Sequence, residues 1–241
     1  MYRITDDPEA GFSEEDRYAL RVLSGPLYRP AHVEMLNRVA HPGREKDPTR
    51  RVGPSAVTLS PLIRVALSML GTACIKGQAA GRFSPQAHWW GDLVVAHDLS
   101  QGGGQRWHMM AQNASSAVSA GIRLEAIEAL WGDDLDALTA DERQYVSFAR
   151  QVIAGSVDDE SWAREVELVG SERGVMELTI LYLYLAMLVR AGQVFGLEPD
   201  LDAGQLRELL DGLRAGTWPL IDVGEYSRAF EQDIFTRIGL D

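Results

Sequence analysis

Apolar residues recur at helical spacing along most of this chain, and helix-capping residues mark where many of the segments begin. Ser-Pro pairs at 60–61 and 84–85 place a capping hydroxyl before a proline, which is favoured at the first helical position. Residues 139–142 match the capping box, and Ser171 precedes the longest apolar run. These signals predict a chain built from successive helices.

The predicted helices alternate with short polar or glycine-containing connections. They cover residues 14–23, 31–39, 60–80, 84–100, 105–119, 124–131, 139–154, a segment beginning at 158, 177–195, 203–213 and 226–238. The polar stretch 41–51 is predicted to be an exposed loop. No segment shows the two-residue alternation of a strand, so the fold class is predicted to be all-α.

Composition narrows the classes of partner. The chain has 241 residues and a formal net charge of −12, which disfavours binding to nucleic acid and favours a small-molecule substrate. The mostly apolar stretch 178–189 is twelve residues long, which is shorter than a membrane span requires, so we expect a core helix and no membrane partner. The acidic N-terminus lacks signal-peptide character, and the single cysteine, Cys74, fits a reducing compartment. A cytoplasmic location is predicted.

Four segments resemble the carboxymuconolactone decarboxylase-like, or alkylhydroperoxidase-like, superfamily: 83–99, 114–153, 158–166 and 176–200. The resemblance implies a multi-helix orthogonal bundle over residues 57–200, with an N-terminal extension of short helices at 1–56 and a C-terminal helical extension at 201–241. It also implies a homo-oligomer, a trimer or a multiple of one. Asp92 falls where relatives carry an acidic residue, usually glutamate.

The sequence departs from the redox members of that superfamily at the helix after residue 100. The positions of their two cysteines fall at Arg106 and Met109, and the position of their histidine falls at Asn113. Thiol peroxidase chemistry needs a thiolate and a resolving partner, which Cys74 alone does not provide. We therefore expect a non-redox protein without a cofactor.

His88 and Asp92 are four residues apart on a predicted helix, so they share one face. A carboxylate in that position orients an imidazole or raises its pKa, which would make the pair an acid/base unit. The alternative is a surface ion pair without function. His97 points about 140° away from Asp92 around the helix and is predicted to be structural.

Three glycines at 102–104 precede the helix that carries His108. A helix start exposes unpaired backbone N–H groups, which suit a carboxylate or an enolate. His108 is predicted to be a general acid or base. The residues predicted to bind substrate there are Gly104, Arg106, Trp107, Met109 and Asn113. The alternative is that the glycines form a flexible connector and that the neighbouring Trp and Met side chains belong to the core or a subunit contact.

The leading hypothesis is a cofactor-independent enzyme that moves protons on a small organic acid, with decarboxylation as the favoured reaction. An aromatic or cyclic ring in that substrate is a further, separate expectation. His108, Asp92 and His88 are its predicted catalytic residues. Isomerisation, cyclisation or dehydration would use the same groups, and a non-catalytic ligand- or partner-binding helical protein is the alternative from another class. No metal site is predicted. Of Tyr182 and Tyr184, which cannot face the same direction, one would reach the substrate pocket with its hydroxyl.

Overall fold

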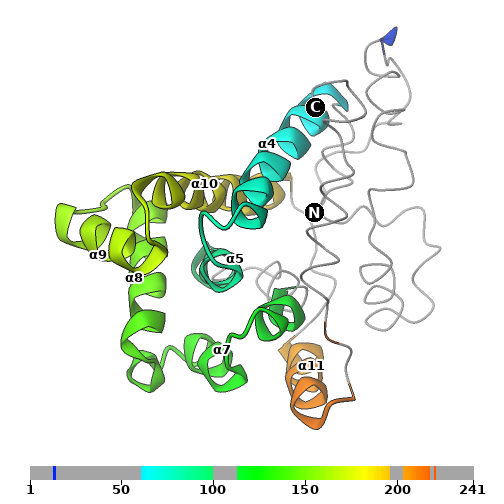
Figure 1. The fold of residues 1–241 in the computed structure, drawn as a ribbon. Helices are drawn as coiled ribbons and strands as arrows, with labels where there is room; N and C mark the ends of the chain where they lie inside the picture. The colour runs from blue at the N-terminus through cyan, green and yellow to red at the C-terminus, as the bar shows by residue number, and fades with distance from the viewer. Residues whose placement is uncertain (1–12, 15–60, 100–112, 196–202, 218–219, 221–241) are drawn as a thin grey trace.

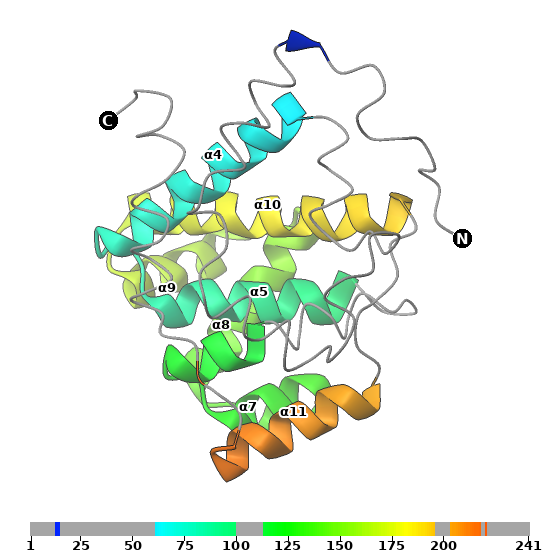
Figure 2. The same ribbon diagram turned by 90° about the vertical axis from the view of Figure 1, so that its right-hand side faces the viewer.

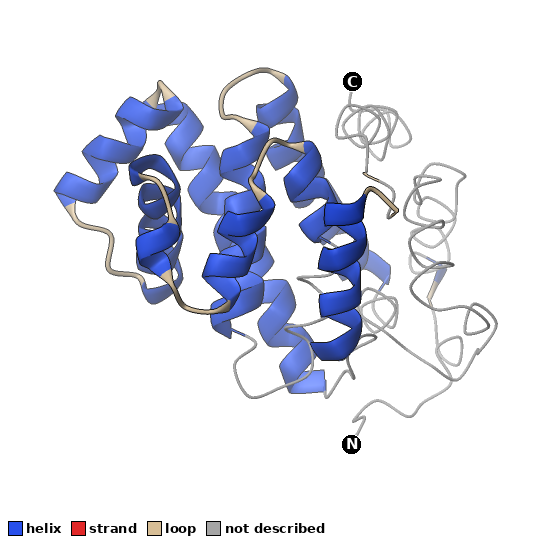
Figure 3. Ribbon diagram, turned by 90° about the horizontal axis from the view of Figure 1, so that it is seen from below, coloured by secondary structure: helices blue, strands red, loops and turns tan. Residues whose placement is uncertain are grey.

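The computed structural model describes residues 13–14, 61–99, 113–195, 203–217 and 220 (Figure 1). Every regular element within these residues is helical, and none of them forms a strand (Figure 3). The prediction of an all-α fold is confirmed at this level. The more specific prediction, an orthogonal bundle of the alkylhydroperoxidase type, stays a prediction.

The helices follow the capping signals closely. In order along the chain they are α4 Pro61–Ala79, α5 Pro85–Leu99, a helix over 113–119, α7 Leu124–Trp131, the 3-10 turn η1 Leu135–Ala137, α8 Ala140–Ala154, α9 Asp159–Val169, α10 Glu172–Phe195 and α11 Ala203–Ala215. The predicted helices 14–23, 31–39 and 226–238, and the first part of 105–119, lie essentially outside the described residues.

Side chains at the helix starts satisfy the free backbone N–H groups. The Thr139 hydroxyl accepts from the Glu142 backbone N–H, and the Glu142 carboxylate accepts from the Thr139 N–H, which completes the predicted capping box of α8. The Asp158 carboxylate accepts from the Ser161 N–H at the start of α9. The Ser171 hydroxyl accepts from the Gly174 N–H at the start of α10. Each cap was visible in the sequence because capping is local.

Helix α5 lies at the centre of the molecule. It contacts α10, α8 and α7, with α10 running along it and α8 crossing it (Figures 1 and 2). All residues from Ala87 to His97 are buried, so the helix has no solvent-facing side over that span. Polar side chains between Ala87 and His97 are therefore inside the protein whichever way they point.

The last two described helices close the molecule on different sides. Helix α10 packs on α4, α5, α8 and α9, and it is long and apolar enough to cross a membrane by length and composition alone. Helix α11 buries Leu209 and Leu210 in the main hydrophobic cluster, and the Arg214 guanidinium donates to the Glu128 carboxylate of α7. In Figure 2, α10 runs across the upper half of the view, below α4, and α11 lies at the bottom.

Candidate functional site

His88 and Asp92 form a pair on the inner part of α5. Their side chains are 4 and 8% exposed, and His88 Nε2 lies 3.6 Å from Asp92 Oδ1. This confirms that the i,i+4 spacing brings them together, and it corrects the alternative of a surface pair. Among the residues that the structure describes, Asp92 Oδ1 finds no hydrogen-bond partner. A carboxyl oxygen with unused hydrogen-bonding capacity thus lies inside the core.

Burial disfavours the charged form of both members of this pair. It lowers the pKa of His88 from 6.5 to about 3 and raises the pKa of Asp92 well above its usual value of 3.8. The expectation that the carboxylate raises the imidazole pKa is wrong, because removing the ring from water outweighs any attraction. The pair is a neutral carboxylic acid beside a neutral imidazole rather than an ion pair.

Neighbouring groups fix the His88 ring from two sides. Its Nδ1 lies 2.6 Å from the Gln78 side-chain oxygen of α4, and its ring stacks on Trp89 with centroids 4.6 Å apart. An amide oxygen only accepts, so Nδ1 carries the proton and Nε2 presents its lone pair towards Asp92. The protonated Asp92 carboxyl and the Nε2 acceptor are then matched as donor and acceptor.

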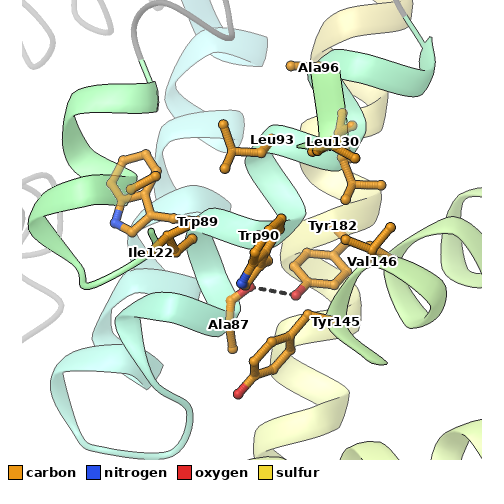
Figure 4. Close-up of a cluster of buried hydrophobic side chains, with 14 of the residues drawn as sticks. Ala87, Trp89, Trp90, Leu93, Ala96, Ile122, Leu130, Tyr145, Val146 and Tyr182 are labelled. Atoms are coloured by element: carbon orange, nitrogen blue, oxygen red, sulfur yellow. Dashed lines mark hydrogen bonds between the residues drawn. The ribbon is translucent and has the colours of Figure 1, made fainter. Parts of the chain in front are cut away.

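Tyr182 of α10 covers the opposite flank of this part of α5 (Figure 4). Its hydroxyl donates to the Ala87 carbonyl at 2.6 Å (Figure 4). Its ring packs against Gly91, where an added Cβ would come within 1.8 Å of a ring carbon. Burial, with Glu165, Tyr145 and Asp92 nearby, raises the Tyr182 pKa well above 10. Tyr182 thus lies in the core, where it holds α10 against the residue before Asp92, and a contact of either tyrosine with a substrate pocket stays a prediction.

A second polar cluster lies at the C-terminal end of α5. His97 is fully buried, and its Nδ1 lies 2.6 Å from Asp98 Oδ1. Arg150 of α8 binds both oxygens of the Asp98 carboxylate, at 2.7 and 3.0 Å. Partial burial opposes ionisation of Asp98, but the hydrogen bonds from His97 and Arg150 hold its pKa below the usual range. This network joins α5 to α8, in line with the structural role predicted for His97.

A third buried carboxyl, Glu165 of α9, was missed by sequence reasoning. It is fully buried, Gln144 donates to its Oε2 at 3.2 Å, and burial raises its pKa to about 7 despite that hydrogen bond. Its position in the charged segment 158–167 suggests a solvent-facing residue, which is why the pattern hid it.

Several predicted site residues lie outside the described residues: Gly104, Arg106, Trp107, His108 and Met109. Asn113 begins the described part of its helix and is buried, and its side-chain nitrogen has no partner among the described residues. Trp89 and Trp90 are core residues (Figure 4). No three His, Cys, Asp or Glu side chains of the described ranges are grouped as metal ligands would be.

Comparison of the chain with models of protein families, with curated proteins and with solved structures gives no match. The resemblance described under Sequence analysis therefore stays a prediction, and the candidate site rests on its geometry.

Proposed function

We propose that this protein is a cofactor-independent, non-redox enzyme that transfers protons on a small organic acid, with decarboxylation as its reaction. The single observation that carries the proposal is Asp92: a buried carboxyl, kept protonated by desolvation, with one oxygen unused and an imidazole nitrogen 3.6 Å away. A neutral carboxylic acid held in a dry site is a proton donor that operates near neutral pH.

The chemistry assigned to each residue follows from its protonation state. Loss of carbon dioxide from a β-keto acid leaves an enolate, whose carbon takes a proton from the Asp92 carboxyl. His88 Nε2 lies 3.6 Å from that carboxyl with its lone pair towards it, and Gln78 keeps the imidazole in the tautomer that presents this lone pair. The proton returns to Asp92 from water when product leaves.

The remaining parts of the proposed site come from the segment after α5. Arg106 would bind the substrate carboxylate with two hydrogen bonds, and His108 would exchange protons with the substrate at the helix start. Gly104, Trp107, Met109 and Asn113 would surround the substrate. The burial of Asn113 and its unpartnered nitrogen support a polar contact for a ligand at this end of the helix.

A pair of carboxyl-to-amide substitutions tests the proposal. We expect Asp92→Asn to lower the release of carbon dioxide from a panel of aromatic and β-keto acids by on the order of 100-fold or more, as removal of a general acid does. The matched control is Glu165→Gln, which alters a carboxyl that is also buried and whose pKa is also raised, but which lies on α9. This control should turn over like the parent, and His108→Ala should lose activity like Asp92→Asn.

Two other results have defined meanings. Exchange of substrate carbon-bound hydrogen with deuterated water, without carbon dioxide release and lost in Asp92→Asn, would assign the same residues to isomerisation, cyclisation or dehydration. Activity unchanged in both Asp92→Asn and His108→Ala would refute the residue assignment.

The second candidate is a non-catalytic helical protein that binds a ligand or a partner chain. The observation that favours it is the depth of the pair, because His88 and Asp92 are enclosed by α4, α5 and α10 as core polar residues are. It predicts that no substrate in the panel turns over and that Asp92→Asn changes stability alone.

A further inference from the structure

Helix α9 lies at the edge of the molecule, where it packs on α8 and α10 (Figure 1). Only two of its side chains are buried, Ser161 and Glu165, and both are polar. Its apolar contacts with the core come from side chains that are only partly buried, namely Trp162, Val166, Leu168 and Val169. A helix that buries little apolar surface is among the parts of a protein that open at the lowest cost in free energy.

The chain turns at a glycine on either side of α9. Gly155, which ends α8, has a φ of 67°, and Gly170, which ends α9, has a φ of 91°. Side-chain-bearing residues rarely adopt this left-handed region. A Cβ added at either glycine would meet no atom of the described residues within 4 Å. The two connections therefore have room to change direction while α8 and α10 stay in place.

The Glu165 carboxyl is held by a single neutral group. Gln144 Nε2 of α8 donates to Glu165 Oε2 at 3.2 Å and to the Ser161 carbonyl at 3.3 Å. Within the described ranges, Glu165 Oε1 has no hydrogen-bond partner and no cationic side chain contacts the carboxyl. An ionised Glu165 would thus bury a full charge against one amide donor, whereas the protonated form buries a neutral group, which costs much less.

The ionisable groups that act on this site from the neighbouring helices supply no positive charge. Burial, and to a smaller extent Glu165, raises the pKa values of Tyr145 on α8 and Tyr182 on α10. Both phenols are therefore neutral at any pH near 7 and do not compensate a carboxylate. The acidic groups that raise the pKa values of these tyrosines in the same sense are Asp141 and Asp92.

The arginines nearest in the sequence are engaged with other carboxylates. Arg164 of α9 pairs with Glu160, and both side chains are exposed. Arg173 at the start of α10 pairs with Glu177 of its own helix. Of the groups that the structure describes on α8, α9 and α10, none therefore offsets a charge on Glu165.

We propose that α9 is a pH-sensitive latch: it stays docked on α8 and α10 while Glu165 keeps its proton, and it opens when that carboxyl ionises. The connections at Gly155 and Gly170 change direction as it opens. Opening brings Glu165 into water and moves Trp162 away from Phe148, whose ring centroid lies 6.3 Å from that of Trp162 in the closed form.

The pH range of the latch follows from the difference between its two forms. In the closed form burial, opposed by the Gln144 hydrogen bond, raises the Glu165 pKa from 4.5 to about 7, and in the open form water returns it to about 4.5. Between these values the open form gives up its proton first, so the opening equilibrium constant rises with pH. The rise is up to about tenfold per pH unit and on the order of 100-fold in all, and it levels off above about pH 7.

The experiment is native-state hydrogen exchange of the full chain, read by mass spectrometry of α9 peptides and corrected for the intrinsic exchange rate at each pH. We expect the opening constant of α9 to rise between about pH 5 and 7. Glu165→Gln should abolish this rise and keep α9 closed, because an amide does not ionise. The matched control is Glu167→Gln, which removes a carboxyl from an exposed position of the same helix and should keep the rise. Peptides of α5 should stay more strongly protected than those of α9 throughout.

A second variant tests the latch without altering Glu165. Gln144→Leu removes the hydrogen bond that opposes the rise of the Glu165 pKa, so the pH at which the opening constant levels off should move upward. A purely structural role for Gln144 would instead change the opening constant by the same factor at every pH.

Three results would overturn the latch. The first is an opening constant of α9 that does not change with pH in the parent protein. The second is an equal pH dependence in the parent and in Glu165→Gln, which would assign it to another group. The third is exchange of α9 peptides no faster than that of α5 peptides, which would mean that α9 opens only when the whole protein unfolds.

Discussion

Asp92 and Asp98 lie on the same helix, yet their surroundings drive their carboxyls to opposite states. Among the residues that the structure describes, no cation contacts Asp92, and burial raises its pKa. Asp98 is also partly buried, but His97 and Arg150 donate to it and its pKa is lowered. Six residues of helix separate a carboxyl that keeps its proton from one that gives it up, so partners decide the role, not residue type.

We expect the largest consequence of this difference in the way the free energy of unfolding changes with pH. Burial lowers the His88 pKa from 6.5 to about 3, so its contribution to the free energy of unfolding is complete above pH 6.5 and is lost as the pH falls. Burial raises the Asp92 pKa, so its contribution is complete below pH 3.8 and is lost as the pH rises. Above about pH 4, and up to pH 6.5 at most, the two slopes have opposite signs in the parent protein.

Replacing either His88 or Asp92 should leave the pH dependence of the free energy of unfolding that the other residue causes. Relative to the parent, we expect the free energy of unfolding of Asp92→Asn to rise with pH by up to about 1.4 kcal/mol per unit over this range, and that of His88→Gln to fall similarly. Urea unfolding at fixed ionic strength measures both. Slopes of the same sign in the two variants would show that the pair is not a neutral acid beside a neutral base.

At neutral pH the second-largest effect is expected at Asp98. Asp98→Asn weakens the hydrogen bonds to His97 and Arg150, and with side chains of 23 and 31% exposure at Asp98 and Arg150 we expect a loss of about 2 kcal/mol. Asp92→Asn should cost less than about 1 kcal/mol, because its carboxyl makes no strong bond that the amide forgoes. Urea unfolding at pH 7 measures the free energy of unfolding that each variant loses.

A double-mutant cycle supplies the control for Asp98. Once Arg150 is replaced by methionine, Asp98→Asn should lose most of its effect, because the charged partner is gone. If Asp92→Asn lowers the free energy of unfolding as much as Asp98→Asn does, Asp92 acts as a packing residue, and its unpaired oxygen does not indicate a function.

The sequence predicts well those features that depend on residues close together along the chain. The caps at Thr139, Asp158 and Ser171 use residues within three positions, and the His88–Asp92 pair needs only one helical turn, so both follow from spacing. The helix boundaries follow for the same reason. None of these inferences needs knowledge of what surrounds the helix.

What the sequence does not predict depends on surroundings. Because α5 is buried on all sides, its polar residues give no amphipathic pattern, and the spacing of His88 and Asp92 could not distinguish core from surface. Arg150 reaches Asp98 across 52 positions, and Glu165 is buried by the packing of α8 on α9. The expectation of a raised His88 pKa is wrong for this reason, because desolvation depends on how the whole protein packs.

The smallest expected effect concerns Asp133, which lies just after α7 with its carboxylate oxygen 3.3 Å from His97 Nε2. Asp133 is 63% exposed and adopts a left-handed conformation with φ 57°. The His97 nitrogen makes no hydrogen bond with proper geometry among the described residues, so the contact is a proximity rather than a bond. Asp133 is joined to the Asp98 network more loosely, by its carboxylate oxygen lying 3.9 Å from Arg150 Nη2.

Asp133→Asn tests this looser contact, because asparagine tolerates the same left-handed backbone and removes only the charge. We expect the free energy of unfolding to change by less than about 0.5 kcal/mol, as for an exposed pair screened by water. Asp133→Gly provides the control for the backbone. It relieves the strain of the left-handed conformation, but it also gives the unfolded chain more conformational freedom, and the two effects offset each other. A loss in Asp133→Asn as large as that in Asp98→Asn would mean that both carboxylates hold His97, and that the contrast with Asp92 rests on two acidic partners instead of one.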